Sequence, residues 1–266
     1  SRRQRQMCIR DSAIIKQRVK NTAEFFDYKL KLEDKVAEQT NVLRKAYRTL
    51  QIQAEHLKKK NQQIIEMLGT VVEYRSTESG EHIQRVKGYT RILAEAVMED
   101  YPEYELTKEK IDIIESVSAL HDIGKIAIPD RILLKPGRLT SEEFEYMKSH
   151  TIRGCELLDS IKEDWNDDTM KYAYEICRHH HERYDGKGYP DGLVGDEIPI
   201  CAQLVSVADV YDALVNERCY KDAFSKEDAY RMIITGECGV FSPKLMESFR
   251  KVRPAFEKLA NKSFRK

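Results

Sequence analysis

The first quarter of the chain repeats an apolar residue at every seventh position. These positions hold Val36, Leu43, Leu50, Leu57, Ile64 and Val71. A second set, four residues after each of the first five, holds Thr40, Tyr47, Ala54, Asn61 and Leu68. Two seams with a mean spacing of about 3.5 residues are typical of a coiled coil, and leucine in the first set favours two strands. We therefore predict a long helix that pairs as a parallel homodimer stalk. The weak second set leaves open a single helix packed on its own domain.

This pattern divides the chain into three parts. Residues 1–12 show no hydrophobic period and are interpreted as a non-native leader. Residues 13–68 are predicted to form the helical linker with the stalk, because no glycine or proline interrupts the seam before Gly69. Residues 69–266 remain for a separate domain.

Beyond the stalk, apolar residues recur at helical spacing nearly throughout. The predicted helices cover residues 83–97, 111–120, 140–150, 169–183 and 202–215. Thr140 followed by Glu143 is a capping box at the start of the third. Ser225, and Ser242 with Pro243 after it, mark two further helix starts. Strand-like alternation is absent, so we predict an all-α fold.

Composition narrows the class of protein. The 266 residues contain 45 Lys+Arg and 45 Asp+Glu, and this balance argues against a general nucleic-acid binder. The six cysteines form no CxxC pair, which favours reduced thiols over a disulfide framework. No apolar run approaches the roughly 18–20 residues that cross a bilayer, and the arginine-rich start is not followed by a signal sequence. We expect a soluble cytoplasmic protein without a membrane segment.

Two short motifs carry the candidate chemistry. One is HDIGK, from His121 to Lys125; the other is HHERYDGKGYP, from His180 to Pro190. His82, His150 and Asp209 lie around them. Imidazoles together with carboxylates suit iron, manganese and similar ions. The combination therefore predicts a metal site.

These motifs resemble those of the HD-GYP family, a branch of the HD superfamily of metal-dependent phosphohydrolases. The likeness runs from about Glu66 to Phe249. It implies an HD-superfamily helical bundle behind the coiled-coil helix. It also implies a cyclic di-GMP phosphodiesterase of the response-regulator type in bacterial second-messenger signalling. A receiver domain upstream, missing from this fragment, and contacts of the Gly-Tyr-Pro loop with GGDEF proteins are further expectations from the resemblance.

The resemblance also implies a ligand set for two or three divalent transition metal ions, with iron or manganese expected. The expected ligands are Glu78, His82, His121, Asp122, His150, His180, His181 and Asp209. Asp122 is the residue expected to bridge two metals. Glu78, four residues before His82, is expected to support a third.

Substrate binding needs cations for two phosphodiesters. The resemblance implies Lys125, Arg183, Arg218 and Lys221 for this role, and Gly188, Tyr189 and Pro190 as a wall near the nucleotide. A hydroxide bridging two metals would attack phosphorus while Lys125 neutralises phosphoryl charge. Asp122, Lys125 and Asp212 are the expected catalytic residues, with Asp212 orienting the nucleophile or transferring a proton. The products would be pGpG and, with a third metal, GMP.

Two alternatives remain open. The domain could bind a cyclic dinucleotide or a partner protein without hydrolysing anything, although the sequence shows no loss among the metal-binding or Gly-Tyr-Pro residues. It could also be an HD hydrolase acting on another cyclic dinucleotide, such as cyclic GMP-AMP.

Overall fold

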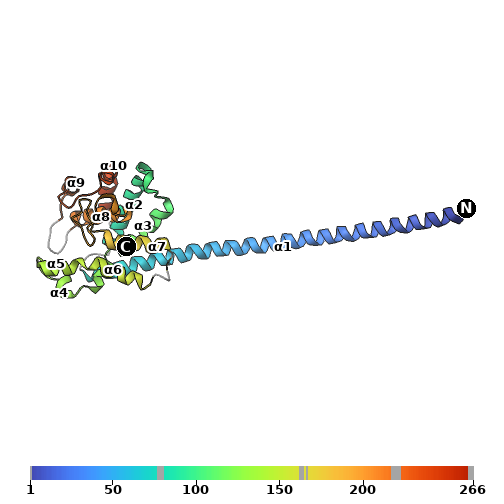
Figure 1. The fold of residues 1–266 in the computed structure, drawn as a ribbon, viewed down its shortest axis with the longest axis horizontal. Helices are drawn as coiled ribbons and strands as arrows, with labels where there is room; N and C mark the ends of the chain where they lie inside the picture. The colour runs from blue at the N-terminus through green and yellow to red at the C-terminus, as the bar shows by residue number, and fades with distance from the viewer. Residues whose placement is uncertain (1, 77–80, 162–164, 166, 217–222, 263–266) are drawn as a thin grey trace. The chain divides into compact units, whose positions relative to one another are not determined.

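A computed structural model describes residues 2–76, 81–161, 165, 167–216 and 223–262, with side chains from residue 12 onward. The helices are α1 (Arg2–Arg75), α2 (Glu81–Asp100), η1 (Pro102–Tyr104), α3 (Lys108–Val117), η2 (Ser118–Leu120), η3 (Ile123–Ala127), α4 (Asp130–Leu133), α5 (Ser141–Lys148), α6 (His150–Asp159), α7 (Asp167–His179), η5 (Gly195–Glu197), α8 (Ile200–Val215), α9 (Lys226–Thr235) and α10 (Pro243–Ala260); elements written η are 3₁₀ helices (Figure 1).

The all-α prediction is confirmed, because the described residues contain no strand beyond one isolated bridge. The predicted helix starts are confirmed as well. Thr140 caps α5 by accepting from the Glu143 amide at 3.2 Å, and Glu143 accepts from the Thr140 amide at 2.7 Å. Ser225 caps α9, and α10 begins at Pro243.

Two helix ends differ from the prediction. The expected helix over 140–150 is two helices, because α5 ends at Lys148 and α6 begins at His150. The expected helix over 169–183 ends at His179. The chain then makes a tight turn, and a Cβ on Gly188 would lie only 2.3 Å from the Arg183 amide nitrogen. Residues 180–183 therefore belong to the loop that follows α7 and not to the helix.

The chain divides into two units by its internal contacts, Ser1–Lys60 and Asn61–Lys266. Gly69, which we took as the first residue of the second domain, lies inside α1. A Cβ at this position would lie 2.3 Å from the carbonyl oxygen of Ala119, so glycine here permits close packing of α1 against η2. The last turns of α1 are thus part of the second unit.

The predicted apolar seam of α1 lies on the surface. Leu43, Leu50 and Leu57 are 72%, 63% and 60% exposed. Within the second unit, Ile65 and Val72 are buried, whereas their neighbours on the seam, Ile64 and Val71, are about half exposed. The last turns of the helix therefore bury one face, and the seam stays uncovered by the described part of the chain.

The second unit is built around α2 and α7. α2 packs against α3, α8 and α10, and α7 packs against α3, α6 and α8. Tyr89, Tyr211 and Phe256 form an aromatic centre with ring centroids 4.7–5.2 Å apart. In the part of the chain that is described, no helix has the length and apolarity needed to cross a bilayer.

Candidate metal centre

The ends of several short helices converge on one point. His121 and Asp122 lie between η2 and η3, His150 is the first residue of α6, and His180 follows α7. Gly124 explains the close approach, because a Cβ there would lie 1.8 Å from the carbonyl oxygen of His150. Only glycine allows η3 to pack this tightly on α6, which brings Asp122 next to His150.

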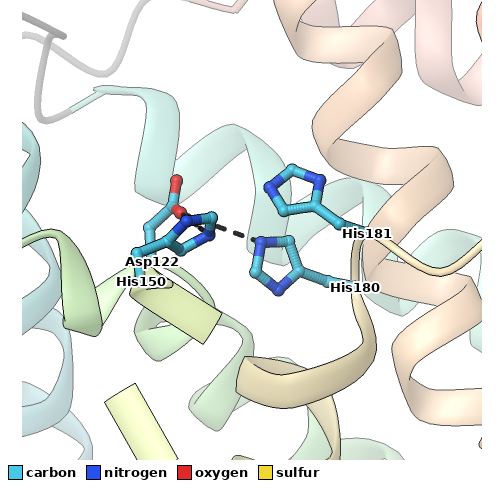
Figure 2. Close-up of side chains that lie close together, drawn as sticks. All are labelled: Asp122, His150, His180 and His181. Carbon is cyan, nitrogen blue, oxygen red and sulfur yellow. Dashed lines mark ion pairs between the residues drawn. The ribbon is translucent and has the colours of Figure 1, made fainter. Parts of the chain in front are cut away.

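One group of possible ligands consists of Asp122, His150, His180 and His181, whose ligand atoms all lie within 4.8 Å of one another (Figure 2). Asp122 Oδ1 lies 3.2 Å from His150 Nε2 and 3.7 Å from His180 Nε2. We call this the three-histidine group.

A second group lies on the other side of Asp122 and consists of Glu73, His82 and His121, again within 4.8 Å of one another. Asp209 joins it, with Oδ1 at 3.7 Å from His82 Nε2 and 4.0 Å from His121 Nε2. Asp122 Oδ2 lies 3.2 Å from His121 Nε2. One carboxylate therefore presents one oxygen to each group, which is the arrangement required of a ligand that bridges two ions.

The imidazole rings are held in the orientation that metal binding requires. His121 Nδ1 lies 2.9 Å from the Ser118 carbonyl, His150 Nδ1 2.8 Å from that of Met147, and His180 Nδ1 3.0 Å from that of Ile176. A carbonyl only accepts, so each Nδ1 carries the hydrogen. Among the described residues, the buried Nε2 atoms of these three rings have no hydrogen-bond partner. The donor set and the orphaned atoms fit divalent metal ions.

The two groups differ in charge. Burial lowers the pKa of His181, helped by the neighbouring imidazoles, and it lowers the pKa of His180 in spite of Asp122, which opposes the shift. Burial also opposes charge on His121, but Asp122, Asp209 and Glu73 outweigh it and raise the pKa of His121 to about 10. The lowered pKa values favour neutral imidazoles at His180 and His181, whereas the raised pKa of His121 means that metal binding there competes with a proton.

Asp212, one of the expected catalytic residues, lies behind His82. It is buried, and its oxygens accept from His82 Nδ1 at 2.8 Å and from Arg85 Nε at 2.6 Å. Asn216 Nδ2 also donates to it at 3.0 Å. These contacts fix the orientation of the His82 ring, with Nδ1 and not Nε2 facing Asp212.

Lys125 lies at the site as predicted from the sequence. Its Nζ is 2.6 Å from Asp122 Oδ2 and 3.9 Å from Glu73 Oε1. Burial alone would raise the pKa of Asp122, but Lys125 and His121 hold this pKa well below its usual value. Arg75, at the end of α1, donates to the carbonyls of Lys125 and Ile126 at 2.9 and 2.7 Å, and so fixes η3.

Glu73 is a site residue that the sequence analysis missed. It is 1% exposed, and within the described residues its Oε1 accepts no hydrogen bond. Nothing in the sequence marks it, because α1 carries many carboxylates and Glu73 belongs to no recognisable spacing with His82. Glu78, the glutamate that we expected to support a third metal, lies outside the described residues.

A cavity of about 320 Å³ opens beside the three-histidine group. Its lining consists of Phe144, Lys148, His180, His181, Glu182, Arg183, Lys187, Tyr189, Ser206, Val210, Cys238, Gly239 and Phe241. Of the predicted substrate-binding residues, Arg183 and Tyr189 line it, and Gly188 and Pro190 flank Tyr189 in the turn. Arg218 and Lys221 lie outside the described residues. Phe144, Lys148 and Phe241 were not foreseen, since they come from α5 and a distant loop.

Another cluster, His179, Glu182 and Asp191, is not available to a metal. Glu182 accepts from the backbone amides of Asp191, Gly192 and Leu193 at 2.7, 3.1 and 3.1 Å. Asp191 accepts from two nitrogens of Arg178, each at 2.7 Å. These contacts hold the Gly-Tyr-Pro loop in place instead.

Comparison with known proteins agrees with this architecture. A family model described as HD domain matches residues 45–239. A cyclic di-GMP phosphodiesterase of Vibrio cholerae is 40% identical over 73% of this chain and 40% of its own length. One from Thermotoga maritima is 42% identical over 71% of this chain and 49% of its own length. The chain therefore spans less than half of either relative.

A solved structure shows the same fold. The cyclic GMP-AMP specific phosphodiesterase V-cGAP3 of Vibrio cholerae aligns with a TM-score of 0.54 and 16% identity, over 76% of this chain and 51% of that one. The chain belongs to the HD domain family, in its HD-GYP branch.

The buried carboxylate of Glu73, close to His82 and His121, leads to a prediction about metal binding. We expect Glu73→Gln to weaken Mn(II) binding by at least about tenfold, because the change removes a charged ligand and keeps its size. Competition with a fluorescent chelator measures the affinity, and Glu55→Gln on the exposed part of α1 is the matched control. An affinity equal to that of the wild type would show that Glu73 is only a counter-ion for Lys125.

Proposed function

We propose that this chain is a metal-dependent phosphodiesterase that hydrolyses cyclic di-GMP to pGpG and then to GMP, with two or three iron or manganese ions. The observation that carries the proposal is the place of Asp122, whose two oxygens face two separate groups of ligands. Ions a few ångströms apart are the usual arrangement in enzymes that cleave phosphodiesters. Cyclic di-GMP is the proposed substrate because the relatives from Vibrio cholerae and Thermotoga maritima are named as its phosphodiesterases.

The residues around Asp122 have separate tasks in this reaction. Bound divalent ions supply Lewis acidity, activating water near neutral pH and neutralising phosphoryl charge. Lys125 Nζ, 2.6 Å from Asp122 and partly exposed, places a fixed positive charge where a phosphoryl oxygen would develop negative charge. Tyr189, whose ring centroid lies 4.7 Å from that of His181, lines the cavity next to the expected ligands and gives the nucleotide a wall.

The proposed site of action is the cytoplasm. Cys155, Cys177 and Cys201 are buried free thiols, as expected for a reducing compartment. None of these three cysteines belongs to a group of possible metal ligands among the described residues.

The proposal predicts a metal-dependent activity that requires Asp122. Protein loaded anaerobically with Fe(II) or Mn(II) is expected to convert cyclic di-GMP to pGpG and GMP, and a chelator is expected to stop it. Asp122→Asn should lower kcat by at least about a thousandfold, because it removes the bridging charge and a metal ligand. Product chromatography measures both effects, with the exposed Asp168→Asn as the control. Full activity of Asp122→Asn would contradict the proposal.

We further propose that two copies of α1 pair through the seam as a parallel dimer. Leu50 and Leu57 lie on the exposed apolar stripe, and a stripe of this length is normally covered. Because the last turns bury Ile65 and Val72 on a different face, the seam is available to a second copy without unpacking the second unit.

This pairing is tested by charge on the seam. The double change Leu50→Asp and Leu57→Asp is expected to turn a dimer into a monomer, since buried like charges oppose association. Light scattering coupled to size exclusion measures the mass. Ile52→Asp, on the same helix but off the seam and 68% exposed, is the matched control and should stay dimeric. A monomeric wild type would refute the stalk.

A further inference from the structure

The cavity beside His181 has the chemistry of a nucleobase site. We propose that it binds one guanine of the cyclic dinucleotide and that Arg183 reads the O6 and N7 edge of this base. The inference rests on the proposed function, and it assigns to Arg183 a role different from the phosphate contact expected from the sequence.

Aromatic rings form the walls of this site. Phe144 and Tyr189 face each other edge to face, with centroids 6.4 Å apart, and Phe241 lines the cavity as well. Bases stack on such rings. A volume of about 320 Å³ is at the lower end of ligand pockets, so the cavity takes one nucleoside half and leaves the other outside. Because Tyr189 also contacts His181, a base held here brings its phosphate next to the three-histidine group.

A lysine sits over the same rings. Lys148 Nζ lies 5.1 Å from the centroid of Phe144 and 5.5 Å from that of Tyr189. Its acidic partner, Glu145, is 2.7 Å away but 69% exposed, and such a surface pair adds little stability. Lys148 is therefore able to turn toward an anionic ligand at the mouth of the cavity at little cost.

Arg183 is placed to read the base. Its side chain lies along Gly239, where an added Cβ would be 3.2 Å from Nε, and no acidic side chain of the described residues forms an ion pair with it. The one carboxylate in the lining, Glu182, is already occupied by three backbone amides. Among its described lining residues, the cavity thus offers side-chain donors and no available carboxylate.

This polarity selects between the purines. Guanine presents two acceptors, O6 and N7, to which an arginine donates in a bidentate manner. Adenine has the N6 amino group in place of O6, so one of the two donors of Arg183 would meet another donor. The site therefore favours guanine over adenine.

The substitution Arg183→Gln distinguishes base reading from phosphate binding. Glutamine pairs with N6 and N7 of adenine, whereas it loses the bidentate contact to guanine. We expect wild-type protein loaded with Mn(II) to prefer cyclic di-GMP over cyclic di-AMP in kcat/KM. We expect Arg183→Gln to reduce this preference by at least about tenfold. Lys171→Gln, on the exposed side of α7, is the control. Equal losses on both dinucleotides would mean a phosphate contact and overturn the proposal.

Two further measurements separate this inference from the proposed function. Hydrolysis of bis(p-nitrophenyl) phosphate, which has no base, reports the metal site alone. If wild-type protein cleaves no diester, the proposed function fails, and calorimetric binding of the two dinucleotides to wild type and Arg183→Gln still tests the base preference. Phe144→Ala should raise the KM for cyclic di-GMP by about tenfold through lost stacking. An unchanged KM would show that Phe144 does not stack on a base of the substrate and would contradict its part in the proposed site.

Discussion

The carboxylate of Asp122 is the point on which the structure of this unit depends. It is almost completely buried, and it faces His150 and His180 with one oxygen and His121 with the other. A buried charge of this kind is costly unless other groups compensate for it. Lys125 and a protonated His121 provide that compensation when no metal is bound. The same carboxylate that organises the protein is therefore the one best placed to bridge two cations.

The fold serves this arrangement by ending helices at the site. η2, α5 and α7 end beside it, and the carbonyls of Ser118, Met147 and Ile176 in these helices hold the histidine rings through Nδ1. His82 on α2 is held by Asp212 instead, which is anchored to Arg85. Because these hydrogen bonds fix each ring through its Nδ1, each Nε2 already points into the site, and no ring has to turn when a metal ion binds.

The sequence predicted much of this, within clear limits. Adjacent pairs such as His121-Asp122 are rare, so the metal chemistry could be predicted, and the helical period predicted the fold class. Glu73 could not be found, because its role comes from the close packing of α1 on η2 at Gly69, which no local pattern reveals. Spacing placed Asp212 near the chemistry, but only the tertiary contacts show that it serves His82. The cavity proposed as the base site was not predicted, because Phe144 and Arg183 line it from segments far apart in the chain.

The most direct test of the account is anomalous diffraction from crystals of the Mn(II)-loaded protein. Two peaks are expected, one on each side of Asp122 and about 3.5–4 Å apart, with each carboxylate oxygen contacting a different ion. One peak is expected among His150, His180 and His181, and the other beside His82, His121 and Glu73. A single ion, or two ions that Asp122 does not join, would contradict it.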